Sequence, residues 1–153
     1  MPRKKNPDYN SHQHSVYKLT YHAVFVVKYR REVITQGMLQ DMRMLTARLM
    51  EGYGGKLTEM DGEADHVHVL FELPPSAAPS RIVCSLKTQL SKVIRAKYKD
   101  DLKEKLWGDA FWAGSYFLTT TGGASIEVVE KYIQNQGKPK RPYRKKNSPE
   151  LGC

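Results

Sequence analysis

The sequence KLTEMDGEADHVHVLFEL, residues 56–73, decides the expected fold. The segments 56–60 and 65–73 are short, rich in apolar and β-branched side chains, and bounded by turn-forming residues, which is typical of strands. Asp61 and Gly62 lie between them and have the chemistry of a tight turn, so we expect the two strands to form a hairpin. Three prolines then end it: Pro74, Pro75 and Pro79.

Strand and helix patterns alternate on both sides of this hairpin. Residues 16–28 and 111–120 are rich in aromatic and β-branched side chains, which predicts two more strands. Apolar residues recur with the helical period in three other segments, and Thr35 and Ser125 are the expected N-caps of the first and the last. The three expected helices run from Thr35 to Gly52, over residues 80–98, and from Ser125 to Gln136.

In chain order the expected elements are strand, helix, strand, strand, helix, strand and helix. This is the split βαβ pattern of a ferredoxin-like sheet with one helix added. We therefore predict an α+β fold: an antiparallel sheet with helices on one face and the tyrosine-bearing C-terminal helix on the other. The 153 residues fit one domain, residues 1–153, with loose ends at 1–15 and in the basic tail 137–153.

Charge indicates the class of partner. Twenty-five Lys and Arg against sixteen Asp and Glu give a net charge of +9, which favours nucleic acid or, as an alternative, an acidic membrane surface. The longest apolar run, Ala23–Val27, is far below the roughly 18 residues of a membrane span, and no secretory signal pattern is present. We expect a cytoplasmic protein without a membrane partner. Cys84 and Cys153 match no zinc motif, so any metal must use other ligands.

Two histidines share one face of the expected strand 65–73. Because side chains alternate along a strand, Val67 and Val69 point to one face, and His66 and His68 point to the other. Their Cα atoms are expected to lie roughly 7 Å apart, which lets two imidazoles reach one cation. The spacing alone also fits an ordinary pair of solvated or hydrogen-bonded histidines.

Tyr132 and Gln136 share one face of the last helix because they are four residues apart. If this helix lies on the open face of the sheet, Gln136 can offer its carbonyl oxygen to a metal held by the histidines, with Tyr132 beside it. The alternative is that both residues only border the apolar stripe of a packed helix. Two imidazoles and an amide oxygen, without a thiolate, favour Mg²⁺ or Mn²⁺ with open positions for phosphate oxygens.

A tyrosine nucleophile fits DNA strand transfer. A phenol is roughly 0.1% ionised at pH 7, so forming the phenolate costs about 4 kcal/mol, which a Lewis-acidic metal and nearby cations can offset. The product would be a phosphotyrosine, from which a DNA hydroxyl can later displace the tyrosine and rejoin strands.

With these motifs the sequence resembles the single-tyrosine HUH transposases of bacterial and archaeal insertion sequences, which include TnpA-type and REP-associated tyrosine transposases. The resemblance covers roughly residues 17–136. It implies a homodimer, dependence on a divalent metal, and a 5′-phosphotyrosine at Tyr132 with a 3′ hydroxyl as leaving group. It also implies recognition of hairpins at element ends, and excision and insertion of the element as single-stranded DNA. Four segments carry it: YHAVFVVKYRREV, DHVHVL, SYFLTTTGG and YIQNQ.

In many members of that family the tyrosine helix reaches the histidines of the other subunit, so the resemblance also allows an active site shared between subunits. Gly122 and Gly123 precede the helix here and would be its hinge, although a simple turn explains them equally well. His22 lies on a sheet face with no expected link to the histidine pair. Asp65 is a candidate to orient one of the histidines, although strand alternation directs it away from that pair.

Cations that can contact DNA occur in three places. Two follow the first strand, three lie on the second helix and its end, and the rest belong to the tail, which can instead be a solvated segment. The candidates are Arg30, Arg31, Lys92, Arg95, Lys99, Lys138, Lys140, Arg141 and Arg144.

Two other functions remain compatible with these residues. One is a non-catalytic module that binds single-stranded nucleic acid, because sheets of this topology often do so. The other is an HUH nickase of replication initiation or plasmid transfer, which the short chain without a helicase domain disfavours.

Overall fold

A four-stranded antiparallel sheet forms the centre of the protein, with its strands in the order β4-β5-β3-β6. The computed structural model describes residues 7–12, 14–106, 108, 110–120 and 126–136. The four strands are β3 (Thr20–Val26), β4 (Lys56–Glu63), β5 (His66–Glu72) and β6 (Phe117–Thr120).

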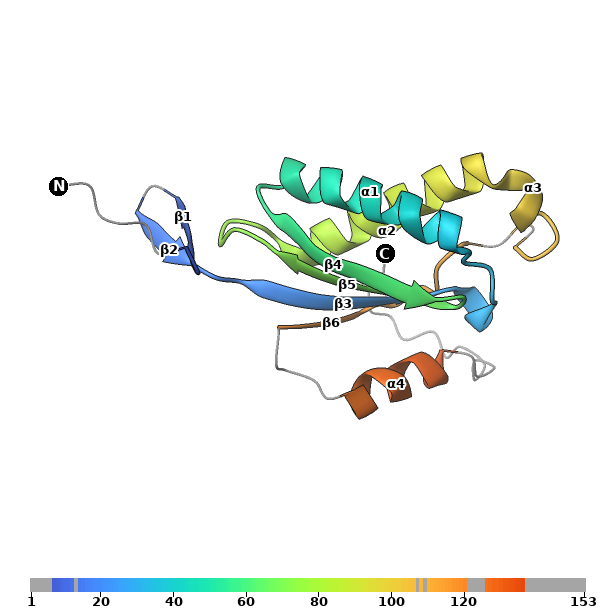
Figure 1. Cartoon of the computed structure of the whole chain (residues 1–153). Helices are drawn as coiled ribbons and strands as arrows, with labels where there is room; N and C mark the ends of the chain where they lie inside the picture. Colours follow the sequence, from blue (N-terminus) through green and yellow to red (C-terminus); the bar gives the residue numbers. More distant parts are fainter. Residues whose placement is uncertain (1–6, 13, 107, 109, 121–125, 137–153) are drawn as a thin grey trace, which may run out of the picture.

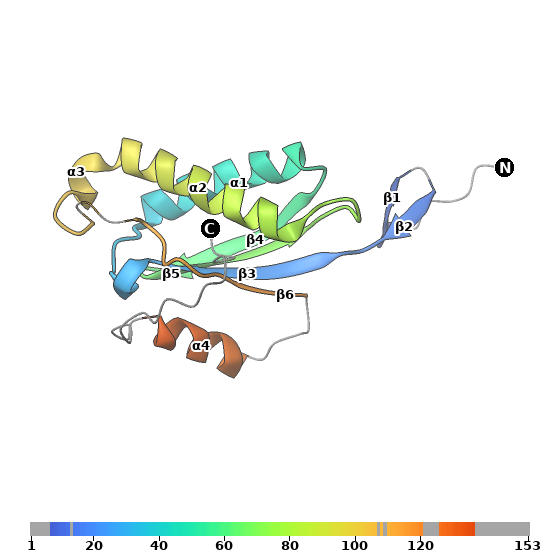
Figure 2. The ribbon, with the colours of Figure 1, turned by 180° about the vertical axis from the view of Figure 1, so that it is seen from behind.

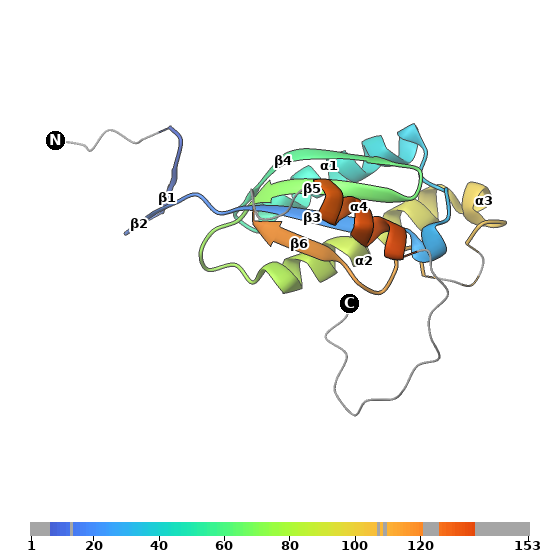
Figure 3. The ribbon, with the colours of Figure 1, turned by 90° about the horizontal axis from the view of Figure 1, so that it is seen from below.

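Helices cover both faces of this sheet. The long helices α1 (Gln36–Gly52) and α2 (Pro79–Lys97) lie side by side on one face, and the short α3 (Lys99–Leu102) follows α2 (Figures 1 and 2). Among the described helices, α4 (Ile126–Asn135) is the one that lies on the opposite face (Figure 3). The predicted α+β architecture is therefore confirmed. Of the helices in the described ranges, none combines the length and the apolar character needed to cross a membrane.

The observed starts of α1 and α2 agree with those expected from the sequence. Thr35 caps α1, where its side chain accepts a hydrogen bond from the backbone N–H of Met38 at 3.2 Å. Pro79 occupies the first turn of α2, where its missing N–H is not needed. The expected cap Ser125 and the glycines Gly122 and Gly123 lie outside the described residues.

The second half of β3, residues 23–26, is buried on both faces, which explains the apolar run in its sequence. Ala23 and Phe25 pack into the main core between the sheet and the helices α1 and α2. Val24 points the other way and packs against Val129 and Ile133 of α4. A strand segment covered on both faces has no solvent-facing positions that would favour polar residues.

The hairpin of β4 and β5 is present, but the predicted turn at Asp61 and Gly62 is wrong. Both residues belong to β4, and the turn lies at Ala64 and Asp65. Gly62 pairs with Val67, and a Cβ atom on Gly62 would collide with the backbone carbonyl of His66. The glycine thus permits a close approach of two strands, a use of glycine that the sequence pattern does not distinguish from a turn.

Two further differences concern strand boundaries. The strand predicted at 111–120 is regular only over Phe117–Thr120; before it, the chain forms an isolated bridge between Val27 and Trp112. Near the N-terminus, β1 (Asn10–His12) and β2 (Ser15–Tyr17) form a small hairpin that extends from the body (Figure 1). The polar composition of this segment did not predict these strands.

Candidate active site

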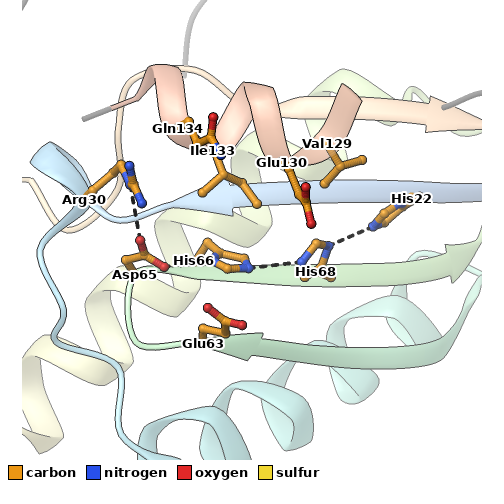
Figure 4. A pocket seen from close by; sticks show the side chains of 10 residues that line it. All are labelled: His22, Arg30, Glu63, Asp65, His66, His68, Val129, Glu130, Ile133 and Gln134. Carbon is orange, nitrogen blue, oxygen red and sulfur yellow. Dashed lines mark hydrogen bonds and ion pairs between the residues drawn. The ribbon is translucent and has the colours of Figure 1, made fainter. Parts of the chain in front are cut away.

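His66 and His68 lie side by side on the face of the sheet that α4 covers. The alternation of β5 places Val67, Val69 and Phe71 in the main core, so the two histidines point away from it. Their Nε2 atoms are 3.1 Å apart and their rings meet edge to face (Figure 4). Both imidazoles therefore direct the same ring nitrogen toward one point in space.

Asp65 fixes the orientation of His66. Its carboxylate lies 2.7 Å from Nδ1 of His66, and the other oxygen accepts a hydrogen bond from Nε of Arg30 at 3.3 Å. Burial raises the pKa of Asp65, but the hydrogen bonds and positive charges of His66 and Arg30 outweigh burial and lower it below its ordinary value. An ionised carboxylate only accepts, so His66 carries its proton on Nδ1 and, when neutral, offers the Nε2 lone pair outward.

The position of Asp65 corrects the direction expected from strand alternation, which pointed this carboxylate away from the histidines. Strand alternation does not apply to Asp65 because β5 begins at His66 and Asp65 belongs to the turn. Backbone freedom in that turn lets the carboxylate reach the ring of the next residue.

His22 also belongs to the histidine cluster, contrary to the sequence interpretation. Its Nε2 lies 3.1 Å from Nδ1 of His68, and the two rings stack with centroids 5.3 Å apart and planes inclined by 25°. His22 comes from β3, which pairs with β5 so that Val24 lies opposite His68. The link depends on strand register between segments far apart in the sequence, which local patterns do not reveal.

The environment keeps His68 neutral. Burial, followed by the charges of His66 and His22, lowers the pKa of His68 to about 4, and burial also lowers the pKa of His22. At neutral pH a neutral imidazole has one lone pair available for a cation or a hydrogen-bond donor.

A cavity of about 660 Å³ opens between the histidines and α4. Arg30 and Asp65 line one end, Glu63 approaches from β4, and Glu130 points down from α4 toward His68 (Figure 4). One ligand atom from each of Glu63, Asp65 and His66 lies within 4.8 Å of the others. The remaining lining residues are His22, Val129, Ile133 and Gln134.

This arrangement fits a divalent cation. Two nitrogens that bind one ion at about 2.1 Å in neighbouring octahedral positions are about 3.0 Å apart, close to the 3.1 Å between the Nε2 atoms of His66 and His68. Asp65 is placed as the carboxylate that commonly orients a metal-binding histidine. The carboxylate of Glu63 adds negative charge beside the pair.

Tyr132 and Gln136 lie together on a different face of α4 from the cavity. The hydroxyl of Ser115 is 2.8 Å from the phenol oxygen of Tyr132 and donates to Oε1 of Gln136 at 3.1 Å. The Tyr132 ring packs against Phe117 of β6, with centroids 5.4 Å apart. Burial raises the pKa of Tyr132, and the hydrogen bond with Ser115 offsets part of that rise.

Lys87 holds the segment that carries Ser115. The residue is 3% exposed, and its ammonium group donates to the backbone carbonyls of Ala113 at 2.9 Å and Ser115 at 3.0 Å. Burial lowers the pKa of Lys87 to about 8. The position of Ser115 is therefore fixed from the far side of the sheet, by a residue of α2.

The cations considered for DNA contact lie in different parts of the structure. Arg30 lines the cavity, and Arg31 donates to the carbonyl of Lys105 at 2.5 Å. Three others belong to α2 or α3, on the face of the sheet opposite the histidines: Lys92, Arg95 and Lys99. The tail candidates Lys138, Lys140, Arg141 and Arg144 lie outside the described residues.

Comparison with known proteins identifies the family of this chain as one of transposases. The family model described as "Transposase IS200 like" matches residues 15–136. The transposase TnpA of ISDra2 from Deinococcus radiodurans is 31% identical over 121 residues, which cover 79% of this chain and 86% of the relative. The IS200 transposase of Salmonella typhimurium is 30% identical over 129 residues, covering 84% of each.

Solved structures agree with this assignment. A crystal structure from Deinococcus radiodurans, described provisionally as a transposase, superposes with a TM-score of 0.75 at 25% identity and covers 83% of this chain and 97% of that one. A REP-associated tyrosine transposase bound to a REP hairpin shares the fold, with a TM-score of 0.51 at 12% identity, covering 81% and 68%. The chain belongs to the IS200-like transposase family.

Proposed function

We propose that this transposase cleaves and rejoins single-stranded DNA at the ends of an insertion sequence, with Tyr132 as the nucleophile. The observation that carries the proposal is the pair of Nε2 atoms of His66 and His68, which lie 3.1 Å from each other beside a cavity of about 660 Å³. The hairpin bound by the REP-associated relative supports structured DNA ends as the substrate.

His66 and His68 would hold a divalent cation, Mg²⁺ or Mn²⁺, and Gln136 would complete the protein ligands once α4 has moved. When bound, such an ion withdraws charge from the scissile phosphate and favours attack on phosphorus. Asp65 keeps His66 in the tautomer that this requires, and Arg30, which lines the cavity, can also contact a phosphate oxygen.

The proposed reaction balances as a transesterification. The Tyr132 oxygen loses its proton and forms a bond to phosphorus, while the bond from phosphorus to the 3′ oxygen breaks and that oxygen gains a proton. The product is a 5′-phosphotyrosine and a free 3′ hydroxyl. Attack by another 3′ hydroxyl reverses these steps on a new strand, so excision and insertion need no external energy source.

Before attack, the tyrosine has to leave its contact with Ser115. In the position described, Tyr132 is partly buried and its pKa is raised, which disfavours the phenolate. Either α4 turns toward the histidines of its own chain, or it crosses to those of a second copy in a homodimer with a shared active site. Both movements release the two contacts to Ser115 and bring Tyr132 and Gln136 to one His66–His68 pair.

The test is a covalent-adduct assay. Purified protein is incubated with labelled single-stranded DNA that contains the hairpins from the flanks of its gene, with Mg²⁺ or Mn²⁺, and then analysed in denaturing gels. We expect a slowly migrating protein–DNA adduct that Tyr132→Phe, chelation of the metal and His66→Ala each abolish. An adduct that persists in Tyr132→Phe would exclude Tyr132 as the nucleophile. If the wild type and the variants bind single-stranded DNA equally well and none forms an adduct, the non-catalytic binding module is favoured.

A further inference from the structure

We infer that His22 is a positioning residue for metal binding. Its Nε2 holds His68 through a hydrogen bond, and the donor and acceptor of that bond exchange roles when a cation binds. This inference rests on the proposed function, since it assigns a role beside the His66–His68 pair. It concerns a residue of β3 whose contact with His68 is a hydrogen bond at 3.1 Å to Nδ1, the nitrogen that does not face His66.

Without a metal and with all three imidazoles neutral, the contacts determine the tautomer of each ring. Asp65 accepts from Nδ1 of His66, so Nε2 of a neutral His66 is an acceptor. His68 must then donate from its Nε2 to His66 across 3.1 Å, which leaves its Nδ1 as an acceptor. His22 therefore donates from Nε2 to His68, and the donors run from His22 through His68 and His66 to Asp65.

A cation between His66 and His68 requires a different state of His68. The Nε2 proton must leave, because that lone pair binds the ion, and a neutral His68 then carries its proton on Nδ1. The same 3.1 Å contact can be kept only if His68 now donates and Nε2 of His22 accepts. His22 satisfies both states because an imidazole nitrogen can donate or accept, according to the position of its own proton.

His22 is placed to support His68 and not to replace it. Its Nε2 contacts Nδ1 of His68, on the side of that ring away from His66. Both residues line the main cavity and also a second cavity of about 330 Å³, bordered by Glu59, Asp61 and Leu70. The stacked ring of His22 limits rotation of His68.

Calorimetric titration of the DNA-free protein with Mn²⁺ tests the role of the hydrogen bond. His22→Phe keeps an aromatic ring for stacking but loses the bond, and we expect its dissociation constant for Mn²⁺ to rise about tenfold or more, the usual effect of losing such a partner. His22→Gln retains a group that can donate or accept and should stay within about threefold of the wild type. His12→Phe, at an exposed position of β1, is the matched control and should bind as the wild type does.

Tautomers can be read directly in the unaltered protein, so the inference does not depend on how a variant folds. Long-range proton–nitrogen NMR correlations of the imidazoles should place the metal-free protons on Nε2 of His22, Nε2 of His68 and Nδ1 of His66. Saturation with Mg²⁺ should move the protons of His22 and His68 to Nδ1.

The outcomes separate this inference from the proposed function. If the wild type binds Mn²⁺ and His66→Ala does not, but His22→Phe binds equally well or the tautomer of His22 is unchanged by Mg²⁺, the role of His22 is overturned and the metal site stands. If His66→Ala leaves Mn²⁺ binding unaltered, the metal site of the proposed function is itself wrong.

Discussion

Ser115 provides the most informative perturbation of this protein, because one hydroxyl contacts both Tyr132 and Gln136. Its oxygen lies 2.8 Å from the phenol and 3.1 Å from the amide oxygen. A hydrogen bond at an exposed site contributes about 0.5–1 kcal/mol, so Ser115→Ala should weaken the docking of α4 by about 1–2 kcal/mol. That change raises the fraction of undocked helix by a factor of roughly 5–30.

Hydrogen exchange measures this fraction directly. In Ser115→Ala the amides of α4 should exchange roughly 5–30 times faster, while those of α1 keep the wild-type rate. Thr119→Val is the matched control, because the Thr119 hydroxyl bonds to the backbone carbonyl of Thr120 instead of α4. If release of Tyr132 precedes attack, the initial rate of adduct formation should rise by up to the same factor.

Two results would refute this reasoning. Unchanged exchange of the α4 amides in Ser115→Ala would mean that the two contacts do not hold the helix. Faster exchange combined with slower adduct formation would mean that Ser115 belongs to the reactive arrangement, so that Tyr132 attacks without leaving it.

Three further predictions concern the surroundings of the site. Asp65→Asn should weaken Mn²⁺ binding about tenfold in calorimetry by releasing the orientation of the neighbouring imidazole, whereas the exposed Asp101→Asn should not. Burial lowers the pKa of Lys87 to about 8, from the ordinary 10.5 that the unfolded chain keeps. Between these two pH values the unfolded chain holds more protons than the folded one, so the unfolding free energy of the wild type should rise relative to that of Lys87→Met from pH 8 to pH 10.5. A constant difference between the two proteins over this range would contradict the prediction. Ile133→Ala, which removes a contact with Val24, should weaken α4 docking by about 2 kcal/mol and speed exchange in α4 alone; equal loss of protection in the sheet would show that α4 and the sheet unfold together.

The sheet and its faces were predictable from the sequence because they follow from backbone geometry. Side chains alternate along every strand, so the apolar set Val67, Val69 and Phe71 placed His66 and His68 on the opposite face without knowledge of the partner strands. The helices α1 and α2 follow in the same way from their apolar period and from Thr35 and Pro79 at their starts.

Contacts that depend on register or on a turn could not be predicted. His22 meets His68 only because β3 pairs with β5 in one particular register. Asp65 reaches His66 because the turn begins two residues after Gly62, although glycine favours a turn at position 62 itself. A one-residue change in either place would have produced a different cluster from the same local patterns.

The rotation of α4 about its own axis could not be predicted from the sequence either. Its spacing places Tyr132 and Gln136 on one face, but it does not say which face of the helix meets the histidines. Here Val129 and Ile133 fill the space over β3, and this packing directs Glu130 to the cavity and Tyr132 to Ser115. The stable position of the helix is set by apolar contacts, while the proposed chemistry requires another.

The role of Tyr132 is tested most directly by identifying the residue that becomes bonded to DNA. The adduct formed with hairpin-bearing single-stranded DNA and Mn²⁺ is isolated, digested with protease and nuclease, and sequenced by tandem mass spectrometry. We expect one modified peptide, with a nucleotide joined through its 5′ phosphate to the oxygen of Tyr132. A nucleotide on any other residue, or one joined through a 3′ phosphate, would contradict it.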